Sequence, residues 1–496
     1  MSLHFDNSYA RQLPHACVSW PPSPSPRPRE LFWNPWLADS LSAEFQQWDQ
    51  ARREAVFGGV EVPEGAQPVA QAYAGHQFGG FSAQLGDGRA LLLGELIDRL
   101  GQRVDIALKG SGRTPFARGG DGKAAVGPML REVLISESLH AMGIPSTRAL
   151  AVVASGEWVS RERALPGAIL TRVAHSHLRV GTFEYFAARE DLQGLQRLLD
   201  YTVQRHPPDA ALQDRAQGDT ALALLMSVVQ RQAQLVAQWM GVGFIHGVMN
   251  TDNMSLSGQS IDFGPCAFME AHDPATVYSS IDHHGRYAYG RQPAMAQWNL
   301  ARLAEALLPL MVGDEAHRLD AARAAVQAFS TVFEEAMAQV WRCKLGWPAA
   351  DRLEPAAASE LAKAWQALLQ AHRVDHTLGW RGLLDVVQAR PQRLFDRFGA
   401  GARAASEWVD RWQAQARSSG FVIDAELLER SNPFVIARNH QVEAALASAS
   451  DEGDLRAFRD LLDAVRRPWS EDEALQPYGE PAPPDVAASH RTFCGT

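Results

Sequence analysis

The residues best suited to chemistry lie near the middle of the chain, in "HGVMNTDN" (246–253) and in "DFG" (262–264). Asn253 and Asp262 offer one amide oxygen and one carboxylate, separated by a short predicted hairpin. Mg²⁺ prefers a few oxygen ligands of this kind, with phosphates and water completing its coordination. Asp252 is the only other carboxylate of the loop, and it either accepts a proton or caps a turn. The pattern therefore predicts a metal site that handles phosphate, with Mg²⁺ or Mn²⁺ as the ion.

This pair of motifs is similar to the catalytic loop of protein kinases, with one replacement. In kinases H-R-D-x-x-x-x-N precedes D-F-G, and the Asp of H-R-D accepts the proton of the attacking hydroxyl. Here His246 and Asn253 keep their places, but Val248 stands where that Asp would be. Valine cannot accept a proton, so the loop counts against the ordinary kinase reaction. We expect His246 to orient the loop.

Lys109 ends a predicted strand and is one of only four lysines in the chain. Kinases keep the lysine that grips the ATP phosphates at such a place. A lysine in this role needs a carboxylate partner, and the helix predicted at 127–143 offers Glu132 and Glu137. Five residues apart on a helix, the two point about 140° away from each other, so only one can face the site. The spacing does not choose between them, and we expect the other to be a solvated helix charge.

A glycine-rich stretch, 72–96, precedes Lys109 and ends in "LGDGRA". Gly86 and Gly88 would let backbone N–H groups approach phosphate oxygens, and Arg89 could add a charge-assisted hydrogen bond. Taken alone, the stretch is more typical of a simple hairpin turn.

Two further loops could contribute to the same site. The segment 113–124 either is a plain polar loop or places Asp121 and Gly122 against a nucleotide. Arg172 and Arg179, seven residues apart, are either surface charges or a bidentate clamp on a triphosphate.

The elements that must position these residues follow a fixed order. We expect strands at 89–96 and 103–110, a helix at 127–143, strands at 147–155 and 167–174, and a long helix at 220–244, with mostly helices from about 291 to 467. This order is typical of an α+β, bilobal protein-kinase-like fold with a helical C-terminal extension. We expect an N-terminal arm (1–60), a kinase-like N-lobe (61–155), a kinase-like C-lobe with the metal site (156–310), the helical extension (311–470) and a flexible tail with Cys494 (471–496).

The bulk properties exclude several classes of protein. The 496 residues are 46% hydrophobic, enough for a sizeable core, and the net charge of −10 argues against general nucleic-acid binding. No apolar run reaches the roughly 18 residues that a membrane helix needs. The N-terminus lacks an apolar signal core, so we expect a cytoplasmic protein with neither nucleic acid nor membrane as a partner. Four cysteines without a C-x-x-C motif predict neither a zinc site nor a disulfide framework.

Taken together, these residues make the sequence similar to the selenoprotein O family of protein adenylyltransferases, which have a pseudokinase fold. The similarity begins at about residue 30 and covers nearly all of the chain that follows. It includes "YAGHQFGGFSAQLGDGRA", "LKGSGRTPFARGGDGKA", "TRVAHSHLRVG", "GVGFIHGVMNTDNMSL", "IDFGP" and "DHHGRYAYGRQPAMAQWNLARLAEAL".

The resemblance implies transfer of AMP from ATP to Ser, Thr or Tyr hydroxyls of proteins, with the ATP flipped relative to kinases. It implies that Asp252 is the proton acceptor, that Asn253 and Asp262 hold the metal, and that Glu132 is the carboxylate paired with Lys109. Nucleotide-binding roles are implied for Gly86, Gly88, Arg89, Lys109, Asp121, Gly122, Arg172, Arg179 and Asp262.

Other functions remain open at this point. A kinase transferring the γ-phosphate to a protein or small molecule would retain this fold and metal site, and Val248 counts against it. A nucleotide-binding scaffold would not need the complete set of Lys109, Asn253 and Asp262. UMP transfer from UTP is a further alternative, because no residue here reads the base. The resemblance suggests redox proteins as acceptors.

The resemblance also concerns the C-terminus. Family members often carry a Cys or selenocysteine two residues before the end, where this chain has Cys494. Some relatives pair it with a cysteine beyond D-F-G that this chain lacks, which leaves Cys266 as the nearby candidate. A regulatory Cys266–Cys494 disulfide is thus one hypothesis, and a buried Cys266 with an inert Cys494 is the other.

Overall fold

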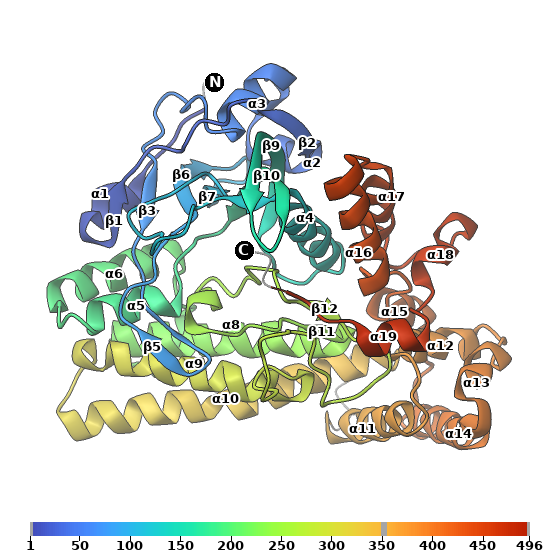
Figure 1. The fold of residues 1–496 in the computed structure, drawn as a ribbon. Coiled ribbons are helices and arrows are strands. Elements are labelled where there is room, and N and C mark those ends of the chain that lie inside the picture. The colour runs from blue at the N-terminus through green and yellow to red at the C-terminus, as the bar shows by residue number, and fades with distance from the viewer. Residues whose placement is uncertain (1–2, 349–354, 494–496) are drawn as a thin grey trace.

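The computed structural model describes residues 3–348 and 355–493, and these residues form an α+β fold. Strands concentrate in the N-terminal part of the chain, whereas the C-terminal part is helical (Figure 1). This division confirms the predicted α+β class. The likeness to protein kinases stays a prediction based on the order of motifs.

An antiparallel sheet of eight strands forms the N-terminal part. Its order is β1-β3-β6-β7-β10-β9-β2, and β8 pairs with β10. The strands are β1 (Cys17–Ser19), β2 (Arg29–Trp33), β3 (Val69–Gln71), β6 (Ala90–Ile97), β7 (Arg103–Lys109), β8 (Ala124–Ala125), β9 (Arg148–Ser160) and β10 (Ala164–Ala174). The four strands expected between 89 and 174 are confirmed as β6, β7, β9 and β10. The N-terminal arm supplies both edge strands, β1 and β2, and so is part of the sheet.

Helix α4 (Val126–Ala141) lies against one face of this sheet and is buried on almost every side. It contacts β9 and β10 there, and also α16 (Asn439–Ala447) and α17 (Arg456–Val465) from the C-terminal part. Its buried residues include Glu132 and Glu137. Its carboxylates therefore need partners inside the protein.

The opposite face of the sheet has its own small core. Helices α2 (Pro35–Leu41) and α3 (Gln50–Phe57) pack their apolar side chains against those of β6, β7 and β9. The sheet is thus enclosed between the N-terminal helices on one face and α4, which contacts β9 and β10, on the other.

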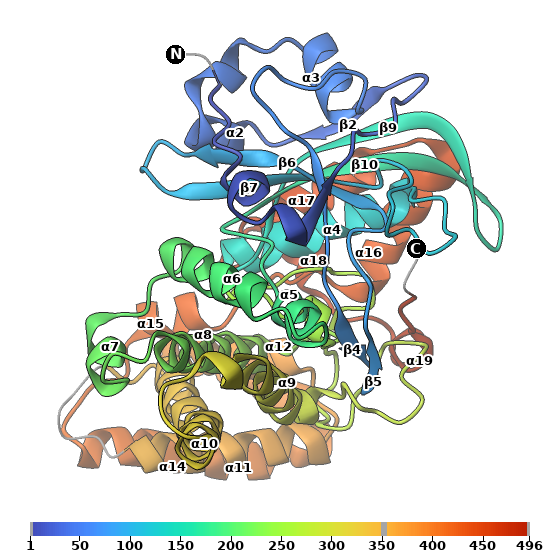
Figure 2. The same cartoon turned by 90° about the vertical axis from the view of Figure 1, so that its left-hand side faces the viewer.

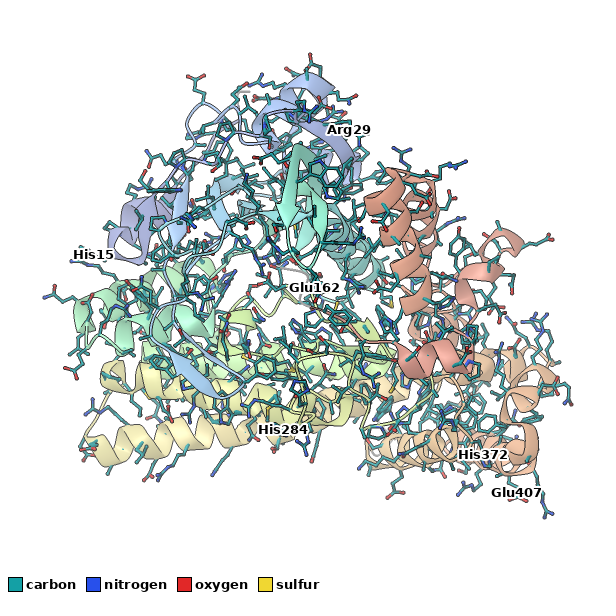
Figure 3. All side chains as sticks on the ribbon, in the orientation of Figure 1. His15, Arg29, Glu162, His284, His372 and Glu407 are labelled. Atoms are coloured by element: carbon teal, nitrogen blue, oxygen red, sulfur yellow. The ribbon has the colours of Figure 1, made fainter. Side chains whose placement is uncertain are left out.

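The helical part is organised around α8 (Thr220–Val242), which packs against α9 (Gln292–Leu307) and α10 (Glu315–Lys344), as Figures 1 and 2 show. The other helices are α1 (Ser8–Gln12), α5 (Val180–Ala187), α6 (Leu192–Arg205), α7 (Ala210–Arg215), α11 (Pro355–Ala371), α12 (His376–Val387), α13 (Gln392–Phe398), α14 (Ala402–Ser418), α15 (Ala425–Ser431), α18 (Gln476–Gly479) and α19 (Pro484–Ser489). Six tryptophans fill the core of the extension: Trp341, Trp347, Trp365, Trp380, Trp408 and Trp412. Figure 3 marks this bundle by His372 and Glu407, far from Arg29 on β2.

Two short antiparallel strand pairs lie outside the eight-stranded sheet. The strands β4 (Gly75–Gln77) and β5 (Gly80–Ser82) form a hairpin that reaches from the sheet down to the helical part (Figures 1 and 2). The strands β11 (Phe244–Ile245) and β12 (Ala267–Phe268) pair on either side of the segment 246–266. This pairing holds the two chemical motifs of the sequence next to each other.

The C-terminal segment returns to the same region. Thr492 donates its hydroxyl to the carbonyl of Pro265 at 2.7 Å, directly after D-F-G. Its backbone N–H also donates to the carbonyl of Tyr278, at 2.9 Å. Across residues 3–348 and 355–493, no helix has both the length and the apolar character required to cross a membrane.

Candidate active site

A cluster of buried charges forms where the sheet meets the helical part. The Lys109 ammonium lies 2.6 Å from Glu132 Oε1 and 2.6 Å from Asp262 Oδ1. Arg172 bridges the same two carboxylates, at 2.7 Å each. Lys109 and Arg172 lie on the same face of neighbouring strands, because Leu170 pairs with Lys109 and Arg172 is two residues further along β10. The sheet register thus brings both cations together.

Asp262 is the carboxylate on which the cluster converges. It has a left-handed backbone, with φ of 64°, and its second oxygen lies 3.9 Å from Arg179 Nη2. Burial alone would raise the pKa of Asp262, but Arg172, Lys109 and Arg179 hold that pKa well below its usual range. Asp262 therefore carries a negative charge at neutral pH and can share it with a cation.

Helix α4 directs its two glutamates to different partners, as their spacing requires. Glu132 belongs to the charged cluster, and its Oε1 also accepts the backbone N–H of Phe263 at 3.3 Å. The expectation that Glu137 is solvated is wrong: its side chain is only 2% exposed and pairs with Arg148 and Arg466. Arg466 comes from α17, and the packing of this distant helix on α4 could not be read from the local pattern.

Arg179 adds a third buried cation beside Asp262. It precedes α5, and its guanidinium lies 4.4 Å from the centre of the Tyr73 ring. Within the described part of the chain, neither its Nε nor the Nε of Arg172 has a hydrogen-bond acceptor. Buried donors without acceptors are costly. An anionic ligand with several oxygens would supply acceptors for both Nε–H groups.

Asp252 lies in a short 3₁₀ turn, Thr251–Asn253, close to this cluster. Its side chain accepts a hydrogen bond from Gln77 Nε2 at Oδ2, over 3.1 Å. Its Oδ1 is buried and has no hydrogen-bond partner among the residues that the structure describes. Burial raises the pKa of Asp252 to about 6, although Arg179 opposes the shift. A carboxylate with a pKa near neutrality can accept a proton and release it again.

The residues around Asp252 are fixed by backbone contacts. Asn253 Nδ2 donates to the Val248 carbonyl at 3.0 Å, which leaves the amide oxygen of Asn253 available to a ligand. The His246 Nε2 donates to the carbonyl of Ile261 at 2.8 Å and so links the loop to Asp262. Burial lowers the pKa of His246, so the ring is neutral. These contacts suit an orienting role for His246.

The donor set of this loop fits a hard cation that also binds phosphate. Asn253 and Asp262 contribute an amide and a carboxylate oxygen, the types that Mg²⁺ prefers. In the described residues, no three His, Cys, Asp or Glu side chains gather as a metal site. A Mg²⁺ ion at Asn253 and Asp262 would therefore need further oxygens from phosphate and water.

The glycines of "LGDGRA" have a packing role that the structure makes explicit. Gly86 has φ of +74°, and a Cβ added there would lie 2.5 Å from the Phe116 ring. A Cβ on Gly88 would lie 2.9 Å from the Phe116 carbonyl. The Arg89 side chain makes no hydrogen bond or ion pair with other described side chains. The nucleotide-binding roles of Gly86, Gly88 and Arg89 stay predictions.

Asp121 and Gly122 lie in the segment between β7 and β8. The Asp121 carboxylate is exposed and pairs with Arg161 at 2.9 Å, so the structure does not bring it to the Lys109 cluster. Gly122 has φ of +69°, and a Cβ there would lie 2.2 Å from the Gly112 carbonyl oxygen. Close backbone approach explains this glycine without a ligand, and both nucleotide-binding roles stay predictions.

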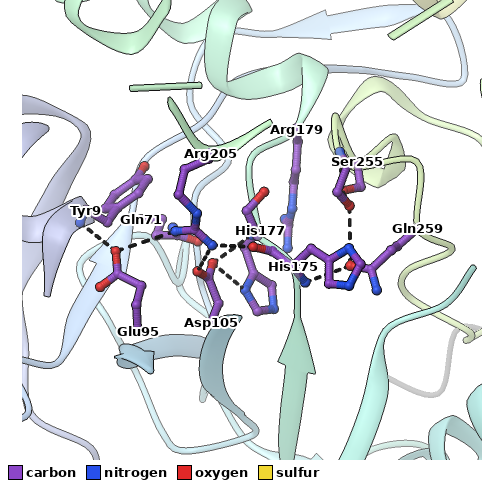
Figure 4. Close-up of polar contacts among 12 residues, drawn as sticks. Tyr9, Gln71, Glu95, Asp105, His175, His177, Arg179, Arg205, Ser255 and Gln259 are labelled. Carbon is purple, nitrogen blue, oxygen red and sulfur yellow. Dashed lines mark hydrogen bonds and ion pairs between the residues drawn. The ribbon is translucent and has the colours of Figure 1, made fainter. Parts of the chain in front are cut away.

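A second buried polar cluster lies close to Arg179 and was not predicted from the sequence (Figure 4). Glu95 and Asp105 face each other across β6 and β7. Arg205 lies 2.8 Å from Asp105, and His177 donates its backbone N–H to the same carboxylate. Burial and Asp105 raise the pKa of Glu95. Two acidic residues inside apolar strands were the available signal, and they mark a cluster that holds the segment leading to Arg179.

Cys494 lies outside the described residues. Cys266 is buried directly after D-F-G, and its Sγ donates to the Phe263 carbonyl at 3.1 Å. The Cys266–Cys494 disulfide stays a prediction.

Comparison with known proteins identifies the family of this chain. The family model described as "Protein adenylyltransferase SelO" matches residues 1–466. A "Protein nucleotidyltransferase YdiU" of Chromobacterium violaceum is 53% identical over 487 residues, covering 98% of this chain and 100% of that protein. Relatives with the same name from Cereibacter sphaeroides and Mycolicibacterium smegmatis are 50% and 49% identical over 499 and 501 residues. Those matches cover all of this chain and 100% and 98% of the two relatives.

These matches define the class of the protein as nucleotidyltransferase. The family match and the identities extend over nearly the whole chain. The chain belongs to the SelO family.

Proposed function

We propose that this nucleotidyltransferase moves AMP from ATP to the hydroxyl of a Ser, Thr or Tyr side chain on a protein, with Mg²⁺ or Mn²⁺. The observation that carries the proposal is the position of the available carboxylate. Val248 stands where a kinase has its base, whereas Asp252, four residues later, is buried with a pKa of about 6 near the Asp262 cluster. In a flipped nucleotide the reacting phosphorus lies at a different place than in a kinase. A proton acceptor at Asp252 rather than at position 248 fits that change.

The proposed step conserves atoms and charge. The hydroxyl oxygen of the acceptor forms a bond to the α-phosphorus of ATP, and the bond from that phosphorus to the β-phosphate bridging oxygen breaks. Pyrophosphate leaves with the electron pair, and the hydroxyl proton passes to the carboxylate of Asp252. Negative charge therefore builds up at the β and γ phosphates, where cations stabilise the transition state.

The cations for that role are Lys109, Arg172 and Arg179. Lys109 has three N–H donors and uses two of them on Glu132 and Asp262, so one remains for a phosphate. Arg172 and Arg179 each retain a buried Nε without an acceptor among the described residues. A Mg²⁺ ion held by Asn253 and Asp262 would neutralise phosphate charge. Glu132 keeps Lys109 and Arg172 in place.

The decisive experiment follows the label from each phosphate. The purified full-length chain is incubated with Mg²⁺ or Mn²⁺, desalted lysate protein, and ATP labelled at either the α or the γ phosphate. We expect label in protein only from the α position, and none with Asp262→Ala. Label from the γ position alone would overturn the proposal. A parallel reaction with α-labelled UTP tests UMP transfer, and a higher rate from UTP would replace AMP by UMP. Redox proteins as acceptors and a bacterial cytoplasmic location stay predictions.

A further inference from the structure

The proposed base contacts the β4–β5 hairpin, which comes from the other part of the molecule. Gln77 at the end of β4 donates its side-chain amide to Asp252 Oδ2 at 3.1 Å. Among the described residues, the other oxygen of this carboxylate, Oδ1, has no hydrogen-bond partner, so Gln77 alone holds the Asp252 side chain by a side-chain hydrogen bond. We propose that Gln77 is a positioning residue, which fixes the orientation of the Asp252 carboxylate for proton transfer. The inference rests on the proposed function of Asp252.

Backbone contacts on either side of Gln77 attach the hairpin to the loop of Asp252. The N–H of His76 donates to Thr251 Oγ1 at 2.7 Å. The N–H of Phe78 donates to Asn250 Oδ1 at 3.1 Å. Three consecutive hairpin residues thus contact three consecutive loop residues. Gln77, between two anchored neighbours, has little freedom to move away from Asp252.

A shared carboxylate strengthens this attachment. Glu184, on α5, accepts the hydroxyl of Thr251 through one oxygen and contacts the His76 ring through the other. Glu184 is buried, as is the Arg179 that precedes the same helix. The hairpin, the Asp252 loop and the helix that follows Arg179 therefore form one connected unit.

The tip of the hairpin is also held in place. Phe78 has a left-handed backbone, with φ of 51°, and its ring packs edge-on against Tyr287 at 5.2 Å. The Tyr287 hydroxyl donates to the same Asn250 oxygen that accepts from Phe78, at 2.6 Å. A non-glycine residue in this conformation is uncommon and needs such support from its surroundings.

Gly75, at the start of the hairpin, leaves room for the other oxygen of the carboxylate. A Cβ added to Gly75 would lie 3.1 Å from Asp252 Oδ1 and 3.2 Å from Asp252 Cβ. The hairpin therefore defines the position of Asp252 in two ways: Gln77 holds Oδ2 by a hydrogen bond, and the missing side chain of Gly75 leaves space for Oδ1.

This geometry predicts a specific kinetic effect. A carboxylate without its hydrogen bond can rotate, and small misplacements of a catalytic group reduce the rate by up to about 100-fold. Gln77 contacts none of Lys109, Arg172 and Asp262, so its loss should not affect nucleotide binding. We expect the transfer rate at saturating ATP to fall about 10-fold or more in Gln77→Leu, with ATP affinity unchanged.

The test uses the full-length chain and two uncharged variants of similar size that lack the amide donor, Gln77→Leu and Gln77→Met. Gln84→Leu, the same replacement on an exposed glutamine just beyond the hairpin, is the matched control. The rate of α-phosphate transfer, the ATP affinity and the melting temperature are measured for each. The inference predicts slow transfer in both Gln77 variants, with ATP affinity and melting temperature equal to the control.

Two outcomes would overturn the inference. Wild-type rates in Gln77→Leu would show that Asp252 does not need the hydrogen bond. A parallel loss of ATP affinity and melting temperature would show that Gln77 only maintains the fold. If the wild-type chain itself transfers no α-phosphate label, the proposed function fails instead, so the two failures are distinguishable.

Discussion

Two of the four lysines are buried, and their surroundings differ. Lys109, in the candidate active site, lies 2.6 Å from each of two carboxylates. Lys344, at the end of α10 in the helical extension, is 3% exposed. Its ammonium has the Ser431 carbonyl at 3.4 Å and the Trp380 ring at 5.0 Å, and no salt bridge to another described residue. Burial lowers the pKa of Lys344 to about 7.

The two lysines differ in how the cost of burying their charge is met. Removing a charge from water is costly unless an opposite charge compensates. Near Lys344 the cost is reduced by loss of the proton, and the residue can be neutral. Around Lys109 the chain supplies two opposite charges, Glu132 and Asp262, which compensate the buried ammonium. Only the second arrangement fits the proposed role of binding a phosphate.

The largest effect is expected when the shared carboxylate of Lys109 is removed. Asp262→Asn keeps the shape of the side chain but leaves Lys109 and Arg172 with Glu132 alone, and it removes a predicted metal ligand. We expect transfer of α-phosphate label to fall about 10³-fold or more. Asp200→Asn, on an exposed position of α6, is the control. Activity within a few-fold of wild type in Asp262→Asn would contradict this role.

Replacement of each lysine by methionine compares the two sites directly. Lys109→Met should reduce transfer by about 10²- to 10³-fold, because it removes the cation proposed to stabilise the transition state. Lys344→Met should leave transfer unchanged, because methionine suits an apolar site, and should not lower the melting temperature. If Lys344→Met abolished transfer while retaining the fold, the separation of the two sites would be wrong.

A smaller effect is expected in the pH dependence of stability. The pKa of Lys344 is about 7 in the folded chain and near 10.5 in the unfolded chain. Between these values the unfolded state binds more protons, so the free energy of unfolding rises with pH. From pH 7 to pH 9 the contribution is about 2 kcal/mol, and below pH 7 it no longer changes.

Denaturant titrations of wild type and Lys344→Met at pH 7 and pH 9 isolate the contribution of Lys344 to the free energy of unfolding, since the variant lacks the titrating group. We expect the stability difference between the two proteins to change in favour of wild type as the pH rises. A difference independent of pH would show that Lys344 remains charged in the folded state.

The sequence predicted the elements of the fold well where the pattern is local. The helix expected at 127–143 is observed as Val126–Ala141, and the strand expected at 103–110 as Arg103–Lys109. Contacts between distant segments could not be predicted this way. Gln77 meets Asp252 across 175 positions, and Glu137 meets Arg466 across 329. Neither the positioning of Asp252 nor the burial of Glu137 has a signature in the spacing of residues.

The sequence predicted part of the charged cluster and left part of it undetermined. The residue types and spacing identified Lys109, Asn253 and Asp262 as a group, but left Glu132 and Glu137 as equal candidates until the family resemblance favoured Glu132. The sheet register explains why Arg172 joins them. Glu95 and Asp105 were not predicted, because their partners, such as Arg205, lie far away in the sequence and no local pattern identifies them.

The central claim is that Asp252 accepts the proton in a transfer of the α-phosphate. The most direct measurement compares wild type with Asp252→Asn, using ATP labelled at the α or γ position together with a measurement of ATP affinity. We predict label in protein from the α position only, about 10²-fold or more slower in Asp252→Asn, with ATP affinity unchanged. Label from the γ position, or an Asp252→Asn variant as fast as wild type, would contradict it.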